Sequence, residues 1–316
     1  DKLNNKIEYR YIPIQSVGIY VPANLPSSLL MNAIPAKKIV GVERVVLANP
    51  RLNGKLNPAV MYAAKKCGIS EILSAGGSQA IASLAYIQRV NKIIGPGNDY
   101  VARAKKEVFG DVGIEGMIAG PSEITVVADK NTNLNEVLTS MISQAEHDTN
   151  SQCILITNNL NLIKSIKKRL NKELNTIPRK SIAKKSLLKN GLIIRTYNNK
   201  QIIDSINEIA PEHLELNIKN YKKLLNKINN AGSIMIGKHS PMSASDYAIG
   251  PTHCLPTLGS AKFSSGLNLD EFYKKTSYIK LSKKGIEVIG KKAITLAEYE
   301  GLIGHALSIK SRIRRS

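Results

Sequence analysis

Short apolar runs alternate with longer amphipathic segments along the first two-thirds of the chain. The short runs have the length of buried strands, whereas the longer segments have the apolar periodicity of helices. Strands are expected at 44–50, 71–77 and 123–129, and helices at 57–68, 78–88 and 99–110. This βαβα order predicts a parallel sheet with right-handed crossovers.

A second alternating block follows the first. Helical patterns occupy 134–147, 163–174 and 201–210, and apolar runs occupy 153–159, 192–198 and 233–237. Beyond residues 264–282 the pattern is helical to the end of the chain. The sequence therefore predicts an α/β protein with two Rossmann-like parallel-sheet domains and a small C-terminal helical extension.

The composition is that of a globular protein with room for two domains. Hydrophobic residues make up 43% of the 316 residues and charged residues 22%. No apolar run approaches the roughly 20 residues of a membrane span, and the polar first residues do not form a signal peptide. The cysteines Cys67, Cys153 and Cys254 are too scattered for a zinc-ribbon or redox motif, so a reduced, cytoplasmic protein is expected.

The formal net charge of +21 raises the question of a polyanionic partner. Basic residues are spread over several predicted helices, however, and Trp, which could stack on bases, is absent from the sequence. This dispersal favours a basic surface without a dedicated partner. We therefore expect no nucleic-acid and no membrane partner.

Two polar clusters contain histidines that could bind a metal ion or accept a proton. Gln144 and His147 lie three positions apart at a predicted helix end, so both project from one face and could bind one metal ion. The alternative is an ordinary helix end with a favourable histidine charge. Glu212 and His213 follow Pro211 and offer two proton acceptors near neutral pH. Their alternative is a solvated helix or loop start.

Two further clusters lie nearer the C-terminus. Asp246 and His253 fall in a Gly- and Pro-containing loop that leaves a strand, and α/β proteins place many sites at the carboxyl ends of strands. A turn-forming Asp246 is the alternative. Glu300 and His305 lie five positions apart in the helical C-terminus, which is not one helical face, so a surface pair is their alternative. His239 is expected on the surface or in a turn.

Glycine-rich turns precede two of the predicted helices. They are AGGSQA at residues 75–80 and GPGN at residues 95–98, and backbone N–H groups at such helix starts can hold phosphate. Neither turn matches the G-x-G-x-x-G pattern, so neither identifies a dinucleotide site alone. A third segment, AGPSE, places Ser122 just before a strand.

Taken in order, these segments resemble the motifs of the histidinol dehydrogenase family. The matching segments are GIYVP, GGSQAIA, GPGN, AGPSE, SQAEH, PEHLE, SDYAIGPTHCLPT and EGLIGH. Eight motifs in the right order are far more specific than any one of them. The chain is therefore identified as a member of this family with a shortened N-terminal part.

The resemblance implies roles for individual residues. The zinc ligands would be Gln144, His147, Asp246 and His305, an N/O set that suits Zn²⁺. His213 would take the hydroxyl proton of the substrate and Glu212 would activate water, which makes them the catalytic pair. The substrate contacts would be Ser122, Gln144, His147, His213, Asp246, Glu300 and His305. The NAD contacts would be Tyr20, Gln79 and Asn98, and His253 would have only a supporting role.

The reaction implied is the oxidation of L-histidinol through L-histidinaldehyde to L-histidine in histidine biosynthesis, with two NAD used in turn and one zinc ion per subunit. Keeping the reactive amino-aldehyde bound between the steps protects it from loss. The resemblance also implies a homodimer in which the C-terminal arm completes the site of the partner.

Three domains and two alternative functions accompany this interpretation. The expected domains are 1–18 with 125–267, then 19–124 as the NAD-contacting domain, and 268–316 as a helical dimerisation arm. The first alternative is a reduced homologue that binds zinc but turns over weakly or not at all, since the NAD-side loops are shortened. The second is a basic nucleic-acid-binding module on the same fold, which the net charge motivates.

Overall fold

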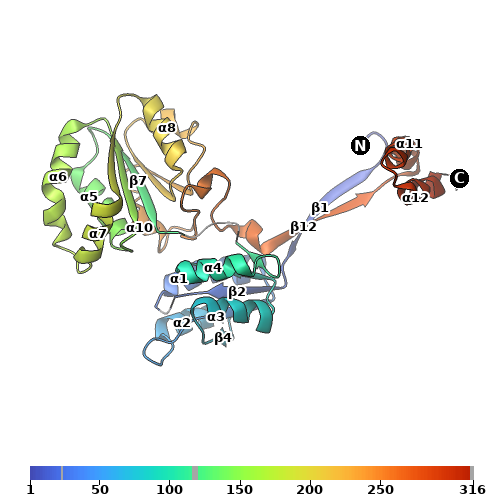
Figure 1. The fold of residues 1–316 in the computed structure, drawn as a ribbon, viewed down its shortest axis with the longest axis horizontal. Coiled ribbons are helices and arrows are strands. Elements are labelled where there is room, and N and C mark those ends of the chain that lie inside the picture. Colours follow the sequence, from blue (N-terminus) through green and yellow to red (C-terminus); the bar gives the residue numbers. More distant parts are fainter. Residues whose placement is uncertain (23, 116–119, 314–316) are drawn as a thin grey trace. The chain divides into compact units, whose positions relative to one another are not determined.

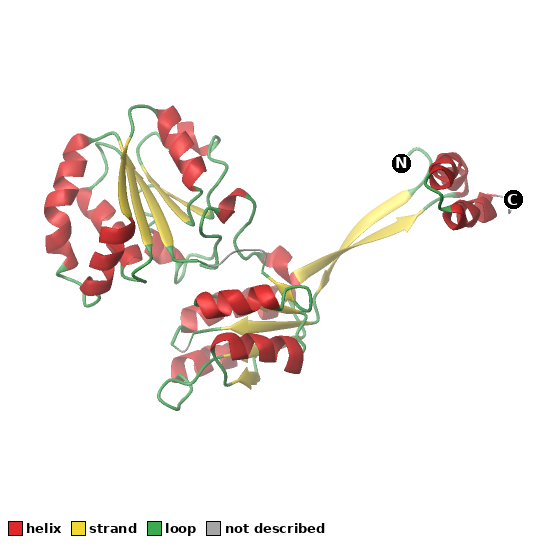
Figure 2. Ribbon diagram, in the orientation of Figure 1, coloured by secondary structure: helices red, strands yellow, loops and turns green. Residues whose placement is uncertain are grey.

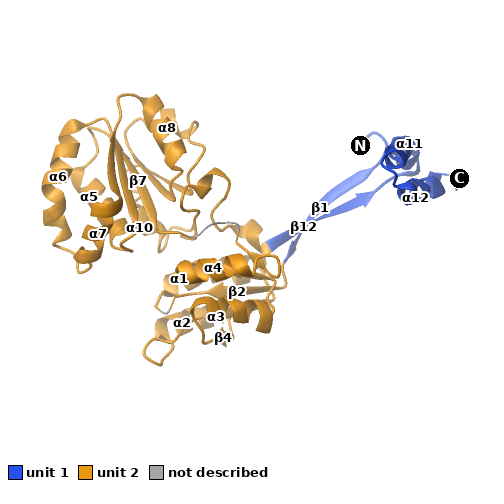
Figure 3. Cartoon of the chain, in the orientation of Figure 1, with its two compact units in different colours: residues 1–13, 273–316 blue, residues 14–272 orange. Residues whose placement is uncertain are grey.

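The computed structural model describes residues 1–22, 24–115 and 120–313, which belong to two compact units (Figures 1 and 3). Unit 1 comprises Asp1–Pro13 and Tyr273–Ser316, and unit 2 comprises Ile14–Phe272. Both predicted parallel sheets lie in unit 2 (Figure 2), so the expected α/β class is confirmed. Among the described residues, no helix is long and apolar enough to cross a membrane.

The first sheet has five parallel strands in the order β4-β3-β2-β5-β6. Its strands are β2 (Ser16–Tyr20), β3 (Arg44–Ala48), β4 (Glu71–Leu73), β5 (Lys92–Ile94) and β6 (Gly113–Ile114). Its α-helices are α1 (Pro26–Ala33), α2 (Pro58–Cys67), α3 (Gly77–Ala82) and α4 (Asp99–Glu107), and π-helical turns at Ile34–Val40 and Ser83–Ile87 extend the first and third. The strand order reverses direction between β2 and β5, which makes the end of these two strands a topological switch point.

Local sequence accounts for the ends of these helices. The side chain of Asn57 accepts hydrogen bonds from the backbone N–H groups of Ala59 and Val60 at the start of α2, and Pro58 fits the first helical position. Gly68 ends the same helix with a φ of 77°, which glycine adopts without strain. These signals are local, and helix α2 follows the expected range closely.

The second sheet is also parallel, in the order β11-β10-β7-β8-β9. Its strands are β7 (Glu123–Ala128), β8 (Gln152–Thr157), β9 (Gly191–Arg195), β10 (His213–Asn217) and β11 (Ser233–Ile236). Its helices are α5 (Leu134–Ala145), α6 (Leu160–Leu174), α7 (Lys180–Asn190), α8 (Asn199–Ile209), α9 (Lys222–Leu225) and α10 (Met242–Ser245), with a 3₁₀ turn at Ser260–Lys262. A second 3₁₀ turn, Leu269–Phe272, contacts the π-helical turn Ile34–Val40 beside the first sheet. All six residues of β7 are buried, as expected for a central strand covered on both faces. Of these elements, sequence patterns did not predict β10, α7, α9 or α10.

Unit 1 corrects two expectations about domains. Strand β1 (Lys6–Pro13) pairs antiparallel with β12 (Tyr273–Lys280), so it does not join residues 125–267, and residues 16–18 belong to β2 of the first sheet. The C-terminal segment was expected to be helical, but it begins with β12 before helices α11 (Lys283–Tyr299) and α12 (Ile303–Ile313). The physical reason is long-range pairing: backbone hydrogen bonds in this ribbon join strands from opposite ends of the chain, which no local pattern specifies.

Candidate active site

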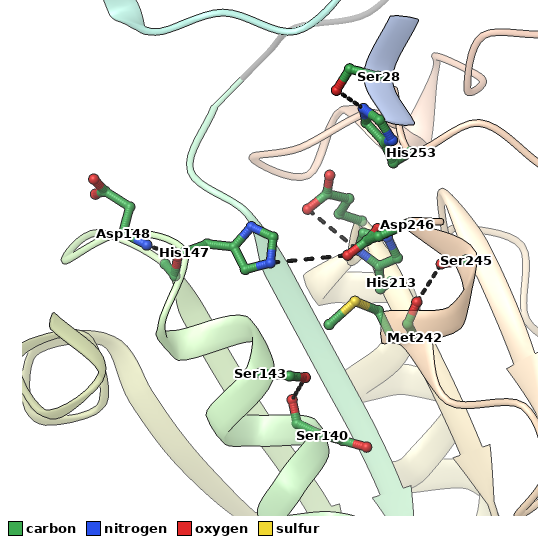
Figure 4. Close-up of polar contacts among 12 residues, drawn as sticks. Ser28, Ser140, Ser143, His147, Asp148, His213, Met242, Ser245, Asp246 and His253 are labelled. Carbon is green, nitrogen blue, oxygen red and sulfur yellow. Dashed lines mark hydrogen bonds and ion pairs between the residues drawn. The ribbon is translucent and has the colours of Figure 1, made fainter. Parts of the chain in front are cut away.

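A cavity of about 260 Å³ in unit 2 gathers most of the polar residues singled out in the sequence. Those that line it are Ser122, Gln144, His147, Glu212, His213, Asp246 and His253. The close-up in Figure 4 shows His147, Asp246 and His213 pointing toward one another from three different segments. Residues more than 100 positions apart in sequence therefore meet at one place.

The Glu212–His213 pair lies at the amino edge of the second sheet. His213 is the first residue of β10 and lies opposite Ile124 of β7 and Ser233 of β11. The alternative of a solvated helix or loop start is wrong, because the side chain of His213 is only 4% exposed. Burial in a central strand, and not a surface turn, sets the environment of this imidazole.

Asp246 lies at the same amino edge, because the chain turns back after β11. Its segment leaves β11 at the carboxyl edge, but α10 then brings Asp246 back, so that its Oδ1 lies 3.9 Å from Nε2 of His213. The backbone N–H of Met242 donates a 2.6 Å hydrogen bond to the buried carboxylate of Glu215, which fixes the start of α10. The expectation that Asp246 lies at the carboxyl ends of strands is therefore wrong, because a buried side chain redirects the loop.

Gln144 and His147 lie at the end of α5, as expected. Gln144 is the penultimate residue of the helix and is 1% exposed, and His147 follows the helix with a side chain that is 46% exposed. Within the described part of the chain, neither the oxygen nor the nitrogen of the buried Gln144 amide has a hydrogen-bond partner. A buried amide without partners costs about 1–3 kcal/mol, which a bound ligand would offset.

These residues have the chemistry of a zinc site. His147 Nε2 lies 4.0 Å from Asp246 Oδ2, within about 0.6 Å of the roughly 3.4 Å that separates two ligands of a tetrahedral ion with bonds of about 2.0–2.2 Å. The amide oxygen of Gln144 adds a further neutral donor. Across the described ranges, no group of three or more His, Cys, Asp or Glu side chains is arranged to hold a metal. Unit 2 thus supplies an amide, an imidazole and a carboxylate, which fit zinc as part of a ligand set.

The Glu212–His213 pair is held by Glu123. The backbone N–H of Glu123 donates a 2.7 Å hydrogen bond to Oε2 of Glu212, and its carbonyl oxygen lies 3.2 Å from Nδ1 of His213. A carbonyl only accepts, so this contact requires a proton on Nδ1, and in the neutral imidazole Nε2 then keeps its lone pair. Nε2 is buried and has no hydrogen-bond partner among the described residues. The arrangement gives a base whose free nitrogen faces Asp246.

Opposing effects act on the pKa values of these groups. Burial acts to lower the pKa of His213, but the neighbouring carboxylates of Glu212 and Asp246 outweigh it and raise the pKa above its ordinary value. Burial raises the pKa of Asp246, against the charges of His213 and His147. Burial likewise raises the pKa of Glu123, and the charge of Glu212 adds to the effect. The cluster is therefore a set of mutually dependent proton acceptors.

The three residues expected to contact NAD gather at the carboxyl edge of the first sheet. Tyr20 ends β2, Asn98 caps α4 after β5, and Gln79 lies in α3 after β4, where its side chain is exposed. Tyr20 and Asn98 thus flank the topological switch point, where open parallel sheets bind ligands. A Cβ on Gly95, whose φ is 112°, would lie 2.1 Å from the carbonyl oxygen of Tyr20, so only glycine fits there.

Glu300 and His305 belong to unit 1. Helix α11 ends at Tyr299, Glu300 is its C-cap, and Gly301 with a φ of 75° turns the chain into α12, whose first turn contains His305. Both side chains are exposed. The expectation that they do not share one helical face agrees with their places on two different helices. His239 is exposed in a turn, also as expected.

Sequence reasoning missed several residues of the site. Glu123 follows Ser122 directly in AGPSE, and a charged residue opening an otherwise apolar strand was the available signal. Ser28 of α1 contacts Nε2 of His253 at 2.9 Å (Figure 4), and no local pattern joins residues so far apart. Lys105 forms a buried ion pair with Glu115, which lines the cavity. Such pairs become visible only in three dimensions.

Comparisons with known proteins identify a family that matches nearly the whole chain. Residues 2–313 match the family model described as histidinol dehydrogenase. Histidinol dehydrogenase of Pelagibacter ubique (strain HTCC1062) is 58% identical over 322 residues, which cover all of this chain and 75% of that protein. The enzyme of that name from Bacillus cereus (strain ATCC 14579) is 45% identical over 95% of this chain and 71% of its own length. The crystal structure of histidinol dehydrogenase from Elizabethkingia anophelis matches with a TM-score of 0.94 and 39% identity, over 98% of this chain and 73% of that chain.

Proposed function

The chain belongs to the histidinol dehydrogenase family, and from this membership we propose that it oxidises L-histidinol through L-histidinaldehyde to L-histidine, reducing one NAD in each step. One observation supports this most: a buried acid–imidazole pair, Glu212 and His213, shares a cavity with Gln144, His147 and Asp246. The pair offers proton acceptors, and the other three residues offer ligands for a substrate anchor.

His213 acts as the base of the first oxidation. Its Nε2 takes the hydroxyl proton of histidinol while the adjacent carbon gives a hydride to NAD, so the alcohol becomes an aldehyde and the electron pair moves to the cofactor. Two features support this role: the carbonyl of Glu123 fixes the proton on Nδ1, and Nε2 is buried and free of partners in the described chain.

Glu212 acts in the second oxidation. Its carboxylate takes one proton from water as the water oxygen bonds to the aldehyde carbon, and the resulting hydrate anion gives a hydride to the second NAD as it loses its remaining hydroxyl proton and becomes a carboxylate. The backbone N–H of Glu123 holds Oε2 of Glu212 at 2.7 Å, so the acid has a fixed orientation. His213 assists by accepting the hydrate's hydroxyl proton.

Zinc and a second subunit complete the proposed site. Gln144, His147 and Asp246 would hold the ion, with the partner subunit's His305 as the fourth ligand and the partner subunit's Glu300 as a substrate contact. When bound, zinc supplies a Lewis-acidic anchor for nitrogen groups of the substrate. Exposed apolar side chains on the helices of unit 1, such as Leu296, Tyr299 and Leu307, support their burial against another chain.

The substrate contacts and cofactor contacts follow from the same assignment. Ser122 joins the zinc ligands and His213 around the substrate in the cavity. Tyr20, Gln79 and Asn98 would contact NAD at the switch point of the first sheet.

NADH formation by the purified protein tests the proposal. We expect histidinol to yield two NADH per molecule, histidinaldehyde to yield one, and chelation to abolish both. Stoichiometric zinc without NADH formation from either substrate would reject the proposal in favour of the inactive homologue. Strongly salt-dependent binding of RNA or DNA together with absent turnover would favour the nucleic-acid-binding alternative.

A further inference from the structure

A second buried glutamate lies directly behind the catalytic pair. Glu123 is 6% exposed, and its carboxylate contacts backbone N–H groups: Oε1 accepts a 2.9 Å hydrogen bond from Leu258, and Oε2 accepts one of 3.4 Å from Glu212. In the described residues it forms no ion pair with Lys or Arg. A buried carboxylate without a cation is costly and is retained in a fold only where its hydrogen bonds matter.

The contacts between Glu123 and Glu212 run in both directions. The carboxylate of Glu123 accepts from the backbone N–H of Glu212, while the backbone N–H of Glu123 donates to the carboxylate of Glu212. The carbonyl of Glu212 accepts a 2.9 Å hydrogen bond from the backbone N–H of Ser233. Both backbone polar groups of Glu212 are therefore fixed. Its carbonyl is held by β11 and its N–H group by the side chain of Glu123.

Close packing leaves Glu212 little freedom to move toward β11. A Cβ on Gly232 would lie 2.6 Å from the carbonyl oxygen of Glu212 and 3.1 Å from Cδ of Pro256. Pro256 and Leu258 lie in the same loop. Glu123 accepts a hydrogen bond from the backbone N–H of Leu258 in that loop. One carboxylate thus joins three segments at the wall of the cavity: the start of β7, the start of β10 and this loop.

We infer that Glu123 is a positioning residue, whose carboxylate holds the backbone of Glu212 and the Leu258 loop so that the carboxylate of Glu212 meets the water and aldehyde of the second oxidation. This inference rests on the proposed function. Glu123 lies behind Glu212 and does not line the cavity, so its effect passes through Glu212. Because its side chain contacts the backbone of Glu212 while only its own backbone contacts the His213 ring, the second oxidation depends on the side chain more than the first does.

Separate assays of the two half-reactions test this inference. Wild-type protein is first shown to oxidise both histidinol and histidinaldehyde, and a failure there concerns the proposed function and not Glu123. In Glu123→Ala we expect kcat for histidinaldehyde to fall by about 100-fold, the scale of a small misplacement of a reacting group. We expect KM for histidinol to stay within about threefold, because the Gln144, His147 and Asp246 side chains keep their places.

Two further variants separate positioning from simple loss of folding. Glu123→Gln keeps the side-chain volume and can accept from only one of the two N–H groups, so its kcat should lie between wild type and Glu123→Ala. Glu136→Gln is the matched control: its carboxylate accepts a 2.8 Å hydrogen bond from Asn217, at the opposite edge of the same sheet. It should melt at a lower temperature than wild type and keep its kcat for histidinaldehyde.

The inference is overturned if Glu123→Gln keeps full kcat on histidinaldehyde, or if it raises KM for histidinol while kcat is unchanged. It is also overturned if both half-reactions of the folded Glu123→Gln variant fall by equal factors, since the side chain would then act on the whole cavity.

Discussion

Nε2 of His213 lies 3.9 Å from Oδ1 of Asp246, and Oδ2 of the same Asp246 lies 4.0 Å from Nε2 of His147. One carboxylate therefore lies between the proposed base and the proposed metal ligand. A substrate held on the metal side would place its alcohol within reach of His213. This geometry links binding to proton transfer.

Replacing the base should strongly reduce turnover while leaving the protein folded. We expect His213→Asn to lower kcat for histidinol by 10²–10⁴-fold, which is the contribution of a positioned proton acceptor. NADH formation under saturating substrate measures it. The same change at His239, which is exposed in a turn, serves as the control and should keep full activity. Unchanged turnover in His213→Asn would contradict the assignment of the base.

Removing the buried amide should weaken zinc binding without weakening the fold. Gln144→Leu has a similar volume and removes two buried polar atoms that have no partner in the described chain, so thermal stability of the zinc-free protein should stay equal or rise. Zinc affinity, measured by competition with a chelator, should fall by at least about tenfold. Gln201→Leu, on the exposed face of α8, should retain wild-type affinity. Equal zinc affinity in Gln144→Leu would remove this residue from the ligand set.

Acid should destabilise the protein through His253. Burial lowers the pKa of His253 from 6.5 to about 4, so the folded state favours the neutral imidazole. Its contribution is complete above pH 6.5 and is lost as the pH falls from 6.5 to about 4, with a total of about 3 kcal/mol. Urea unfolding at pH 7 and at pH 4.5 measures this difference.

The matched variant for this experiment is His253→Gln, which cannot take up the proton and should lose less free energy of unfolding over the same range. If wild type and variant lose the same amount between the two pH values, His253 does not control the acid sensitivity.

The buried ion pair beside the cavity should be needed for stability. Lys105 donates to the carbonyl of Gly95 at 2.5 Å and pairs with Glu115, and both side chains are nearly inaccessible. Lys105→Met leaves an uncompensated buried carboxylate and should lower the free energy of unfolding by about 3–5 kcal/mol. Lys310→Met breaks an exposed pair with Glu298 and should cost about 1 kcal/mol or less. Similar losses of unfolding free energy in the two variants would contradict the larger contribution expected of the buried pair.

Mixing two inactive variants should restore activity if the arm serves the other subunit. In a dimer of His213→Asn with His305→Ala, one of the two sites keeps both histidines and the other lacks both. After denaturation and refolding of an equal mixture, half of the dimers are mixed, so about a quarter of wild-type activity should return. Each variant refolded alone should stay inactive. An inactive mixture would place His305 in the site of its own chain.

The apolar periodicity of the sequence determined the α/β class, most of the described helices, half of the described strands, and the helix end that presents Gln144 and His147. These features depend on residues within a few positions of one another, so local patterns specify them. The motifs also allowed the family to be identified, because their order along the chain is itself a sequence property.

Only the tertiary structure decided which edge of each sheet bears chemistry. His213 looked solvent-exposed because PEHLEL has a short and strongly polar pattern, yet strand pairing with β7 and β11 buries it. Glu123 and Glu215 fix the positions of Glu212 and α10 through hydrogen bonds to distant backbone. The energy of a buried carboxylate depends on which N–H groups surround it, and that depends on the packing of segments that no local pattern relates.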